Sequence, residues 1–154
     1  SWSPEYCAGP NGGRDTTQCG EHRQFGFITH GLWPQYERGG WPQFCSAERM
    51  DNRLIDGLLP LMPSPRLIRH EWSKHGTCSG FDSTGYFRLV RKAYESVGIP
   101  RRYRRPWDAI RQSPSELRAA FRAENRALPE DGFAVYCSGR FLSEVRICLD
   151  KDLK

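Results

Sequence analysis

Apolar side chains recur along the chain at two spacings, one typical of helices and one typical of strands. Four segments have helical spacing or helix-capping signals: 47–59, 66–75, 83–97 and 113–127. The last begins with Ser113, which can cap the helix, and Pro114, which suits the first helical position. Glu116 completes a capping box with Ser113. We therefore expect helices of moderate length separated by loops rich in Gly and Pro.

Shorter apolar runs over 25–28, 133–137 and 141–149 predict strands. The first run ends at His30 and would deliver that side chain to the end of a strand. Ser138-Gly139-Arg140 between the other two runs indicates a hairpin. Helices and strands that are separated in this way predict an α+β fold, in which helices pack on an antiparallel sheet. A chain of 154 residues suits a single domain over 1–154.

The chain has an even number of cysteines, which favours disulfides and an oxidising compartment. They are Cys7, Cys19, Cys45, Cys78, Cys137 and Cys148. Six cysteines allow 15 pairings. Short loops favour Cys7–Cys19 and Cys137–Cys148, which leaves Cys45–Cys78. No pair has the C-x-x-C spacing typical of zinc sites.

The formal net charge is +5, from 23 Lys and Arg against 18 Asp and Glu. This charge suits a polyanionic partner such as nucleic acid, but a solvated basic surface explains it more simply. The densest basic run, 101–105, is open to the same two interpretations. No apolar run is long enough to cross a membrane. The chain begins with Ser1 rather than Met, so we expect that a signal peptide has been removed and that the protein is secreted or periplasmic.

Two short segments concentrate histidines beside other reactive side chains. One places His30 in the sequence THGLWPQ, and the other is HEWSKHGTC over 70–78. If the second segment is helical, its two histidines, a carboxylate and an ammonium share one broad face. They are His70, Glu71, Lys74 and His75. Such a set suits proton transfer and anion stabilisation at a phosphodiester, whereas the simpler alternative is a solvated helix face.

The second segment also invites comparison with the zinc-protease motif H-E-x-x-H. That motif needs histidines four residues apart. His70 and His75 are five apart, and Lys74 would repel a metal cation. We therefore reject a metal centre here and expect no cofactor.

Together, HGLWPQ (30–35) and HEWSKHGTC (70–78) resemble the two active-site segments of the ribonuclease T2 family. The opening SWSPEYC, the GGWPQFC stretch that ends at Cys45, and LSEVRICLD over 142–150 extend the resemblance over almost the whole chain. The resemblance implies a secreted endoribonuclease that cleaves single-stranded RNA without a metal. It implies products with 2′,3′-cyclic phosphate ends, which are then hydrolysed to 3′-phosphates.

The resemblance also implies a role for each residue of the two clusters. His75 would be the general base for the ribose 2′-hydroxyl, and His30 the general acid for the leaving 5′-oxygen. Glu71 and Lys74 would stabilise the transition state, and His70 would hold the phosphate. Histidine chemistry agrees with these roles, because an ordinary pKa near 6.5 allows one ring to be neutral while the other is charged. DNA lacks the 2′-hydroxyl and should not be cleaved.

Three further residues are candidates for contact with the nucleobases. Trp33 and Trp41 can stack on bases, although core packing is the usual role of a tryptophan. Gln35 stands where many relatives have an acidic residue, so base preference should differ. Trp72 is expected to point into the core.

Two other functional hypotheses use the same sequence. A secreted RNA-binding protein without activity would normally lack one of the catalytic histidines, and both are present here. A toxin would carry the same ribonuclease activity together with a proteinaceous inhibitor as partner. We expect a monomer in each case.

Overall fold

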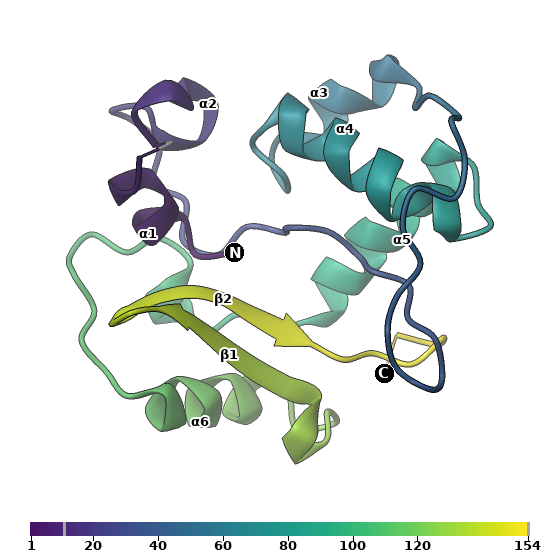
Figure 1. Ribbon diagram of the computed structural model, residues 1–154. Helices are drawn as coiled ribbons and strands as arrows, with labels where there is room; N and C mark the ends of the chain where they lie inside the picture. Colours follow the sequence, from purple (N-terminus) through teal and green to yellow (C-terminus); the bar gives the residue numbers. More distant parts are fainter. Residues whose placement is uncertain (11, 154) are drawn as a thin grey trace. The chain divides into compact units, whose positions relative to one another are not determined.

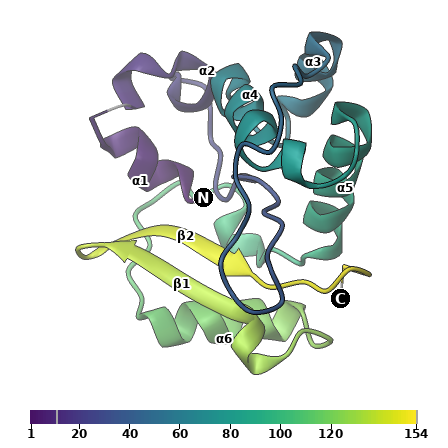
Figure 2. The same cartoon turned by 45° about the vertical axis from the view of Figure 1, so that its right-hand side comes forward.

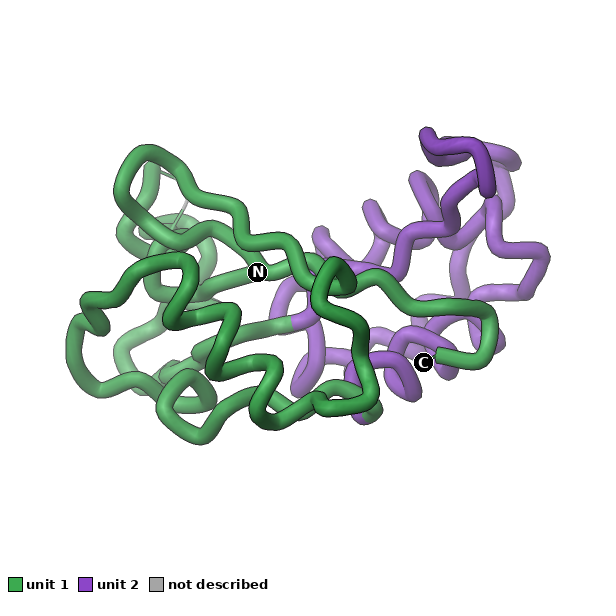
Figure 3. The backbone as a smooth tube through the Cα atoms, turned by 90° about the horizontal axis from the view of Figure 1, so that it is seen from below, with its two compact units in different colours: residues 1–28, 96–154 green, residues 29–95 purple. Residues whose placement is uncertain are grey.

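The computed structural model describes residues 1–10 and 12–153, and it divides the chain into two compact units (Figure 3). Unit 1 comprises residues 1–28 and 96–154, and unit 2 comprises residues 29–95. The two units are described separately below. The expectation of one domain over 1–154 stays a prediction.

Unit 1 combines short helices with a two-stranded antiparallel hairpin (Figure 1). Its elements are α1 (Ser3–Ala8), η1 (Gly12–Arg14), α2 (Thr16–Cys19), η4 (Arg101–Tyr103), α6 (Pro114–Glu124), η5 (Glu130–Gly132), β1 (Phe133–Ser138) and β2 (Phe141–Ile147). Helix α6 lies against the hairpin and buries Leu117 and Phe121 beside Phe133. The predicted capping box between Ser113 and Glu116 is present.

The register of the hairpin overturns one predicted disulfide. Cys137 lies opposite Leu142 near the turn, whereas the Cys148 N–H donates to the Gly132 carbonyl at the open end of the hairpin. Five residues of strand separate these positions, or about 16 Å at 3.3 Å per residue. A disulfide needs Cα atoms within about 7 Å. The predicted Cys137–Cys148 bridge is therefore wrong, and both thiols are free and exposed.

The predicted strand over 25–28 is reduced to a single antiparallel bridge, between Phe27 and Trp2. The Gly26 and Phe27 N–H groups donate instead to the carbonyls of the turn at 103–104. A Cβ on Gly26 would collide with that turn, so glycine permits this close approach. The segment therefore runs as irregular backbone between Trp2 and the turn at 103–104, without forming a strand.

Unit 2 is helical (Figure 2). Its elements are η2 (Asn52–Leu54), α3 (Ile55–Leu58), α4 (Pro65–Lys74), η3 (Gly76–Cys78) and α5 (Ser83–Ser96). Its core is formed by Met50, Ile55, Leu58, Leu61, Met62, Ile68, Trp72, Tyr86, Phe87 and Val90. Ser64 caps α4 by accepting a hydrogen bond from the Leu67 N–H. Trp72 is 2% exposed, so it points into the core as expected.

The helix expected over 47–59 is shorter in the structure and begins only at Asn52. Side chains from other helices take backbone groups just before it. Trp72 Nε1 donates to the Glu48 carbonyl at 2.8 Å, and Ser83 Oγ accepts from the Asp51 N–H at 3.1 Å. These tertiary contacts replace the hydrogen bonds of a first helical turn.

Each unit contains one disulfide. Cys7–Cys19 joins α1 to α2, and Cys45–Cys78 joins the 34–46 loop to the end of η3. Both pairs were predicted, Cys7–Cys19 from its short loop and Cys45–Cys78 only as the pair that remained. Over residues 1–10 and 12–153, no helix is long and apolar enough to span a membrane.

Candidate active site

Unit 2 alone supplies the five predicted catalytic side chains. His30 lies on an extended segment that is tied down when the Thr29 N–H donates to the Leu61 carbonyl. Helix α4 carries Glu71 and ends at Lys74. His75 follows as its C-cap, and its N–H closes the last turn on the Glu71 carbonyl at 3.0 Å.

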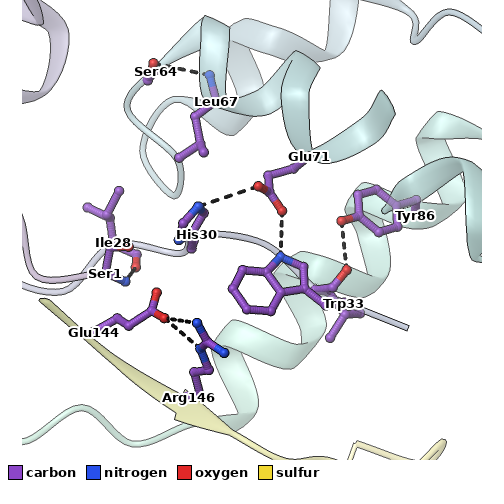
Figure 4. Close-up of polar contacts among 11 residues, drawn as sticks. Ser1, Ile28, His30, Trp33, Ser64, Leu67, Glu71, Tyr86, Glu144 and Arg146 are labelled. Carbon is purple, nitrogen blue, oxygen red and sulfur yellow. Dashed lines mark hydrogen bonds and ion pairs between the residues drawn. The ribbon is translucent and has the colours of Figure 1, made fainter. Parts of the chain in front are cut away.

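A buried carboxylate lies at the centre of this site (Figure 4). The Glu71 side chain is 2% exposed. Its Oε2 accepts a hydrogen bond from Trp33 Nε1 at 2.7 Å, and its Oε1 lies 3.6 Å from His30 Nε2. Glu71 therefore joins the two histidine segments, because both Trp33 and His30 come from HGLWPQ.

Gly31 makes room for that carboxylate. A Cβ at Gly31 would lie 2.0 Å from Glu71 Oε2 and 3.0 Å from Trp33 Nε1. No rotation of a side chain as short as alanine's can relieve such a contact. The glycine after His30 thus allows Glu71 to approach in its present position, because a Cβ there would displace the carboxylate.

Opposing effects act on the pKa of Glu71. Burial raises it above the usual range, because a charged carboxylate loses water there. The nearby His30, the Trp33 hydrogen bond, His70 and Lys74 each lower it, but burial has the larger effect. The positive groups and the indole N–H therefore favour the charged form of Glu71, which burial disfavours.

His75 has the surroundings of a base. The residue is only 3% exposed, and its ring stacks on that of Trp33, with centroids 5.3 Å apart and an angle of 29° between the planes. Its buried Nδ1 has no hydrogen-bond partner among residues 1–10 and 12–153, so a doubly protonated ring would leave one N–H unsatisfied. Burial first, and then the charges of Lys74, His70 and His30, lower the pKa of His75 to about 4. The ring is therefore neutral at and well below neutral pH.

The remaining predicted catalytic residues are more accessible to solvent than Glu71 and His75. His70 is exposed and Lys74 is half-buried. Both are close enough to act electrostatically on Glu71 and on His75. The structure thus places an ammonium, two further imidazoles and a carboxylate around one neutral histidine.

The predicted base-contacting residues have different surroundings. Trp33 contacts the catalytic side chains themselves, through Glu71 and by stacking on His75. Gln35 and Trp41 are exposed, and in the described part of the chain neither makes a hydrogen bond or ring contact with those side chains. Trp33 therefore helps to order the site, which its sequence position alone did not indicate.

Two other contributors escaped the sequence analysis. The Tyr86 hydroxyl, from α5, donates to the Leu32 carbonyl at 2.9 Å and so fixes the HGLWPQ segment. Burial raises the pKa of Tyr86, which keeps the hydroxyl protonated. At Gly76, a Cβ would lie 2.4 Å from the Trp72 ring. The position of Gly76 directly after His75 was the one signal in the sequence that could have indicated its role. Tyr86 gave no such signal, because it occupies an ordinary core position of a helix.

Over residues 1–10 and 12–153, no group of three or more His, Cys, Asp or Glu side chains is arranged to hold a metal ion.

Comparison with known proteins identifies close relatives of the whole chain. A ribonuclease from Aeromonas hydrophila is 38% identical over 168 residues, which cover 99% of this chain and 69% of that protein. The structure of RNase NT in complex with 5′-AMP superposes with a TM-score of 0.64 at 25% identity, covering 84% of this chain and 72% of that one. Actibind, a T2 ribonuclease, shares the fold with a TM-score of 0.53 at 18% identity, covering 80% and 72%.

The family model named Ribonuclease T2 family matches residues 1–154. This match includes both histidine segments and every residue of the site around Glu71. The chain belongs to the Ribonuclease T2 family.

Proposed function

We propose that this protein is a metal-independent endoribonuclease that cleaves single-stranded RNA by transphosphorylation, with His75 as general base and His30 as general acid. The products are 2′,3′-cyclic phosphates, which the same pair hydrolyses to 3′-phosphates. One observation carries the proposal: His75, buried and stacked on Trp33, lies in the same site as a second imidazole, a carboxylate and an ammonium. RNase NT, a structural relative, holds 5′-AMP, which supports a nucleotide as ligand.

The base must be neutral when substrate arrives. His75 meets this condition, because burial and the positive charges around it disfavour its protonated form. Its stacking on Trp33 holds the ring in one orientation. His75 then takes the proton of the ribose 2′-hydroxyl, and the resulting oxygen attacks the adjacent phosphorus. The nucleophile belongs to the substrate, so no serine, cysteine or metal-bound water is needed.

The acid must deliver a proton to the leaving 5′-oxygen. His30 is the more exposed of the two rings, with 40% of its side chain accessible. Glu71, 3.6 Å from His30 Nε2, orients this ring and offsets its positive charge. General acid–base catalysis of this kind contributes about 10²- to 10⁴-fold to a rate.

Negative charge grows on the phosphoryl oxygens in the transition state. The Lys74 ammonium and the His70 ring, both accessible to solvent, are the groups that can meet that charge. Gln35 and Trp41 are the proposed contacts for the nucleobase, because both are exposed on the loop that follows HGLW. The two disulfides favour an oxidising location, either extracellular or periplasmic.

The test is cleavage of a mixed-sequence single-stranded RNA in EDTA, with analysis of the product ends. We expect cyclic phosphate ends, a slower appearance of 3′-phosphates, and no cleavage of the matching DNA strand. His30→Ala and His75→Ala should each lose at least 100-fold in kcat/KM while keeping the fold. His22→Ala is the matched control, because His22 is an exposed histidine of unit 1 outside the site.

Full activity in both site variants would refute the assigned roles. Activity that appears only with a divalent metal would refute metal independence. A folded, oxidised protein that binds RNA without cleaving it would replace the proposal with an RNA-binding function.

A further inference from the structure

A basic surface with an exposed aromatic ring lies on unit 1, far along the chain from the catalytic segments. Residues 101–111 contain five arginines and one aspartate, a formal charge of +4, while the whole chain carries +5. The arginines are Arg101, Arg102, Arg104, Arg105 and Arg111, and all are exposed. An open hollow of about 1060 Å³ is lined by residues of this segment, which we call the arginine surface.

The arginine surface rests on a fixed base. Tyr103, in its middle, is 1% exposed, and its hydroxyl donates to Gln112 Oε1 at 2.6 Å. Its ring stacks on Phe121 of α6, with centroids 6.0 Å apart and planes 6° apart. The Tyr103 carbonyl also accepts from the Phe27 N–H. The flanking arginines are therefore presented from an anchored turn.

Most of the positive charge on this surface is not neutralised. Arg104 donates to the Ile99 carbonyl, and the Arg102 guanidinium lies 5.3 Å from the centre of the Tyr103 ring. In the part of the chain that the structure describes, the side chains of Arg101, Arg105 and Arg111 make neither a hydrogen bond nor an ion pair. Several guanidinium groups gathered around one hollow repel each other, so an anion bound there would be stabilised.

Trp107 adds a second kind of contact. It lies in the lining of the same hollow and is 79% exposed, the largest value among the exposed large apolar residues of the described chain. A tryptophan ring so open to water contributes little to the core. An aromatic ring beside unpaired arginines is the arrangement that binds single-stranded nucleic acid, in which bases stack while phosphates meet positive charge.

We propose that the arginine surface is a second binding site for single-stranded RNA, in which the arginines hold phosphates and Trp107 stacks on a base. The identity of the ligand as RNA substrate rests on the proposed function. The surface would increase affinity for long RNA without contributing to the chemistry on a short substrate.

The first test measures binding without cleavage. The probe is a single-stranded 2′-O-methyl RNA of about 20 nucleotides, which lacks the attacking hydroxyl, and its affinity is followed by fluorescence anisotropy over a range of salt. The test variant carries Arg101→Gln, Arg105→Gln and Arg111→Gln, three side chains without a hydrogen bond or ion pair in the described part of the chain. The slope of log affinity against log salt should decrease in size by about 2, and affinity in dilute salt should drop at least ~10-fold.

The matched control removes the same charge from elsewhere on unit 1. Arg14→Gln, Arg118→Gln and Arg140→Gln affect three exposed arginines outside the hollow. This control should bind nearly as tightly as the parent protein. Equal losses in the two triple variants would mean that net charge alone governs binding, and they would overturn the proposal.

Trp107→Ala tests stacking separately. Loss of one stacked base should weaken binding by about 5- to 160-fold, and Trp107→Phe should restore part of the affinity. Unchanged affinity in Trp107→Ala would show that the surface binds the probe through charge alone. Any polyanion would then bind equally well, and the assignment of a nucleic-acid site would be overturned.

Kinetics separate this proposal from the catalytic one. In the arginine variant, kcat/KM should decrease for long RNA and stay unchanged for a dinucleotide. A protein that cleaves neither substrate but shows the binding differences would refute the catalytic proposal alone. A protein that cleaves long RNA equally well with and without the three arginines would refute the second site alone.

Discussion

The low pKa of His75 makes the stability of the folded protein depend on pH in a way that one substitution should remove. In the unfolded chain this histidine has the ordinary pKa of 6.5, whereas in the folded protein its pKa is about 4. Between these values the unfolded state binds more protons, so stability is lost as the pH is lowered. At pH 4 the folded-state ring is half protonated and the unfolded-state ring almost fully protonated. The free energy of unfolding should therefore fall by about 3 kcal/mol between pH 7 and pH 4 through His75 alone.

His75→Phe keeps an aromatic ring against Trp33 but cannot titrate. Urea unfolding at pH 7 and pH 4 should therefore show a smaller loss of stability in the variant than in the parent protein, by about 3 kcal/mol. His75→Gln provides a second, more polar replacement if the phenylalanine variant does not fold. Equal pH dependence in the parent and both variants would show that His75 titrates normally, and the assignment of His75 as the neutral base would lose its physical support.

Three other substitutions or treatments follow from local geometry. Gly31→Ala would push the Glu71 carboxylate from its position, and a displacement of about 1 Å should lower kcat/KM roughly 100-fold, whereas unchanged kinetics would show that the site tolerates a Cβ there. Ser113→Ala should reduce the free energy of unfolding by about 1 kcal/mol in a urea titration through loss of the α6 cap, and no change would mean that Glu116 and water replace it. Mass spectrometry of the native, unreduced protein after iodoacetamide should show two labels, at Cys137 and Cys148, and an unlabelled protein would restore the third disulfide.

Local signals predicted much of the fold. The capping box at Ser113, the apolar spacing over 83–97 and the hairpin around Gly139 depend on neighbouring residues, and each corresponds to an element of the structure. The 47–59 helix was overestimated because side chains from distant helices take its backbone groups. Strand register could not be predicted from the sequence either. The short loop shows that Cys137 and Cys148 are near in sequence, but it does not show which residues lie opposite them.

The candidate site divides in the same way. The residue types around His70 and His75 indicate acid–base chemistry, and the spacing places them at one end of a helix. The contact between Trp33 and Glu71 joins residues 38 positions apart, so no local pattern contains it. Gly31 makes room for that distant carboxylate, a role that sequence reasoning missed because it treated Gly31 only as part of a motif.

Every side chain to which we assign a chemical step lies between His30 and His75, inside one unbroken stretch of the chain, whereas the arginine surface belongs to a unit assembled from the two ends. The two properties can therefore diverge independently during evolution. Changes in the terminal segments can retune how tightly a long polymer is held, and the reaction itself remains encoded in a segment of fewer than fifty residues. Relatives with similar catalytic segments and different termini would then share a reaction while differing in the polymers they prefer.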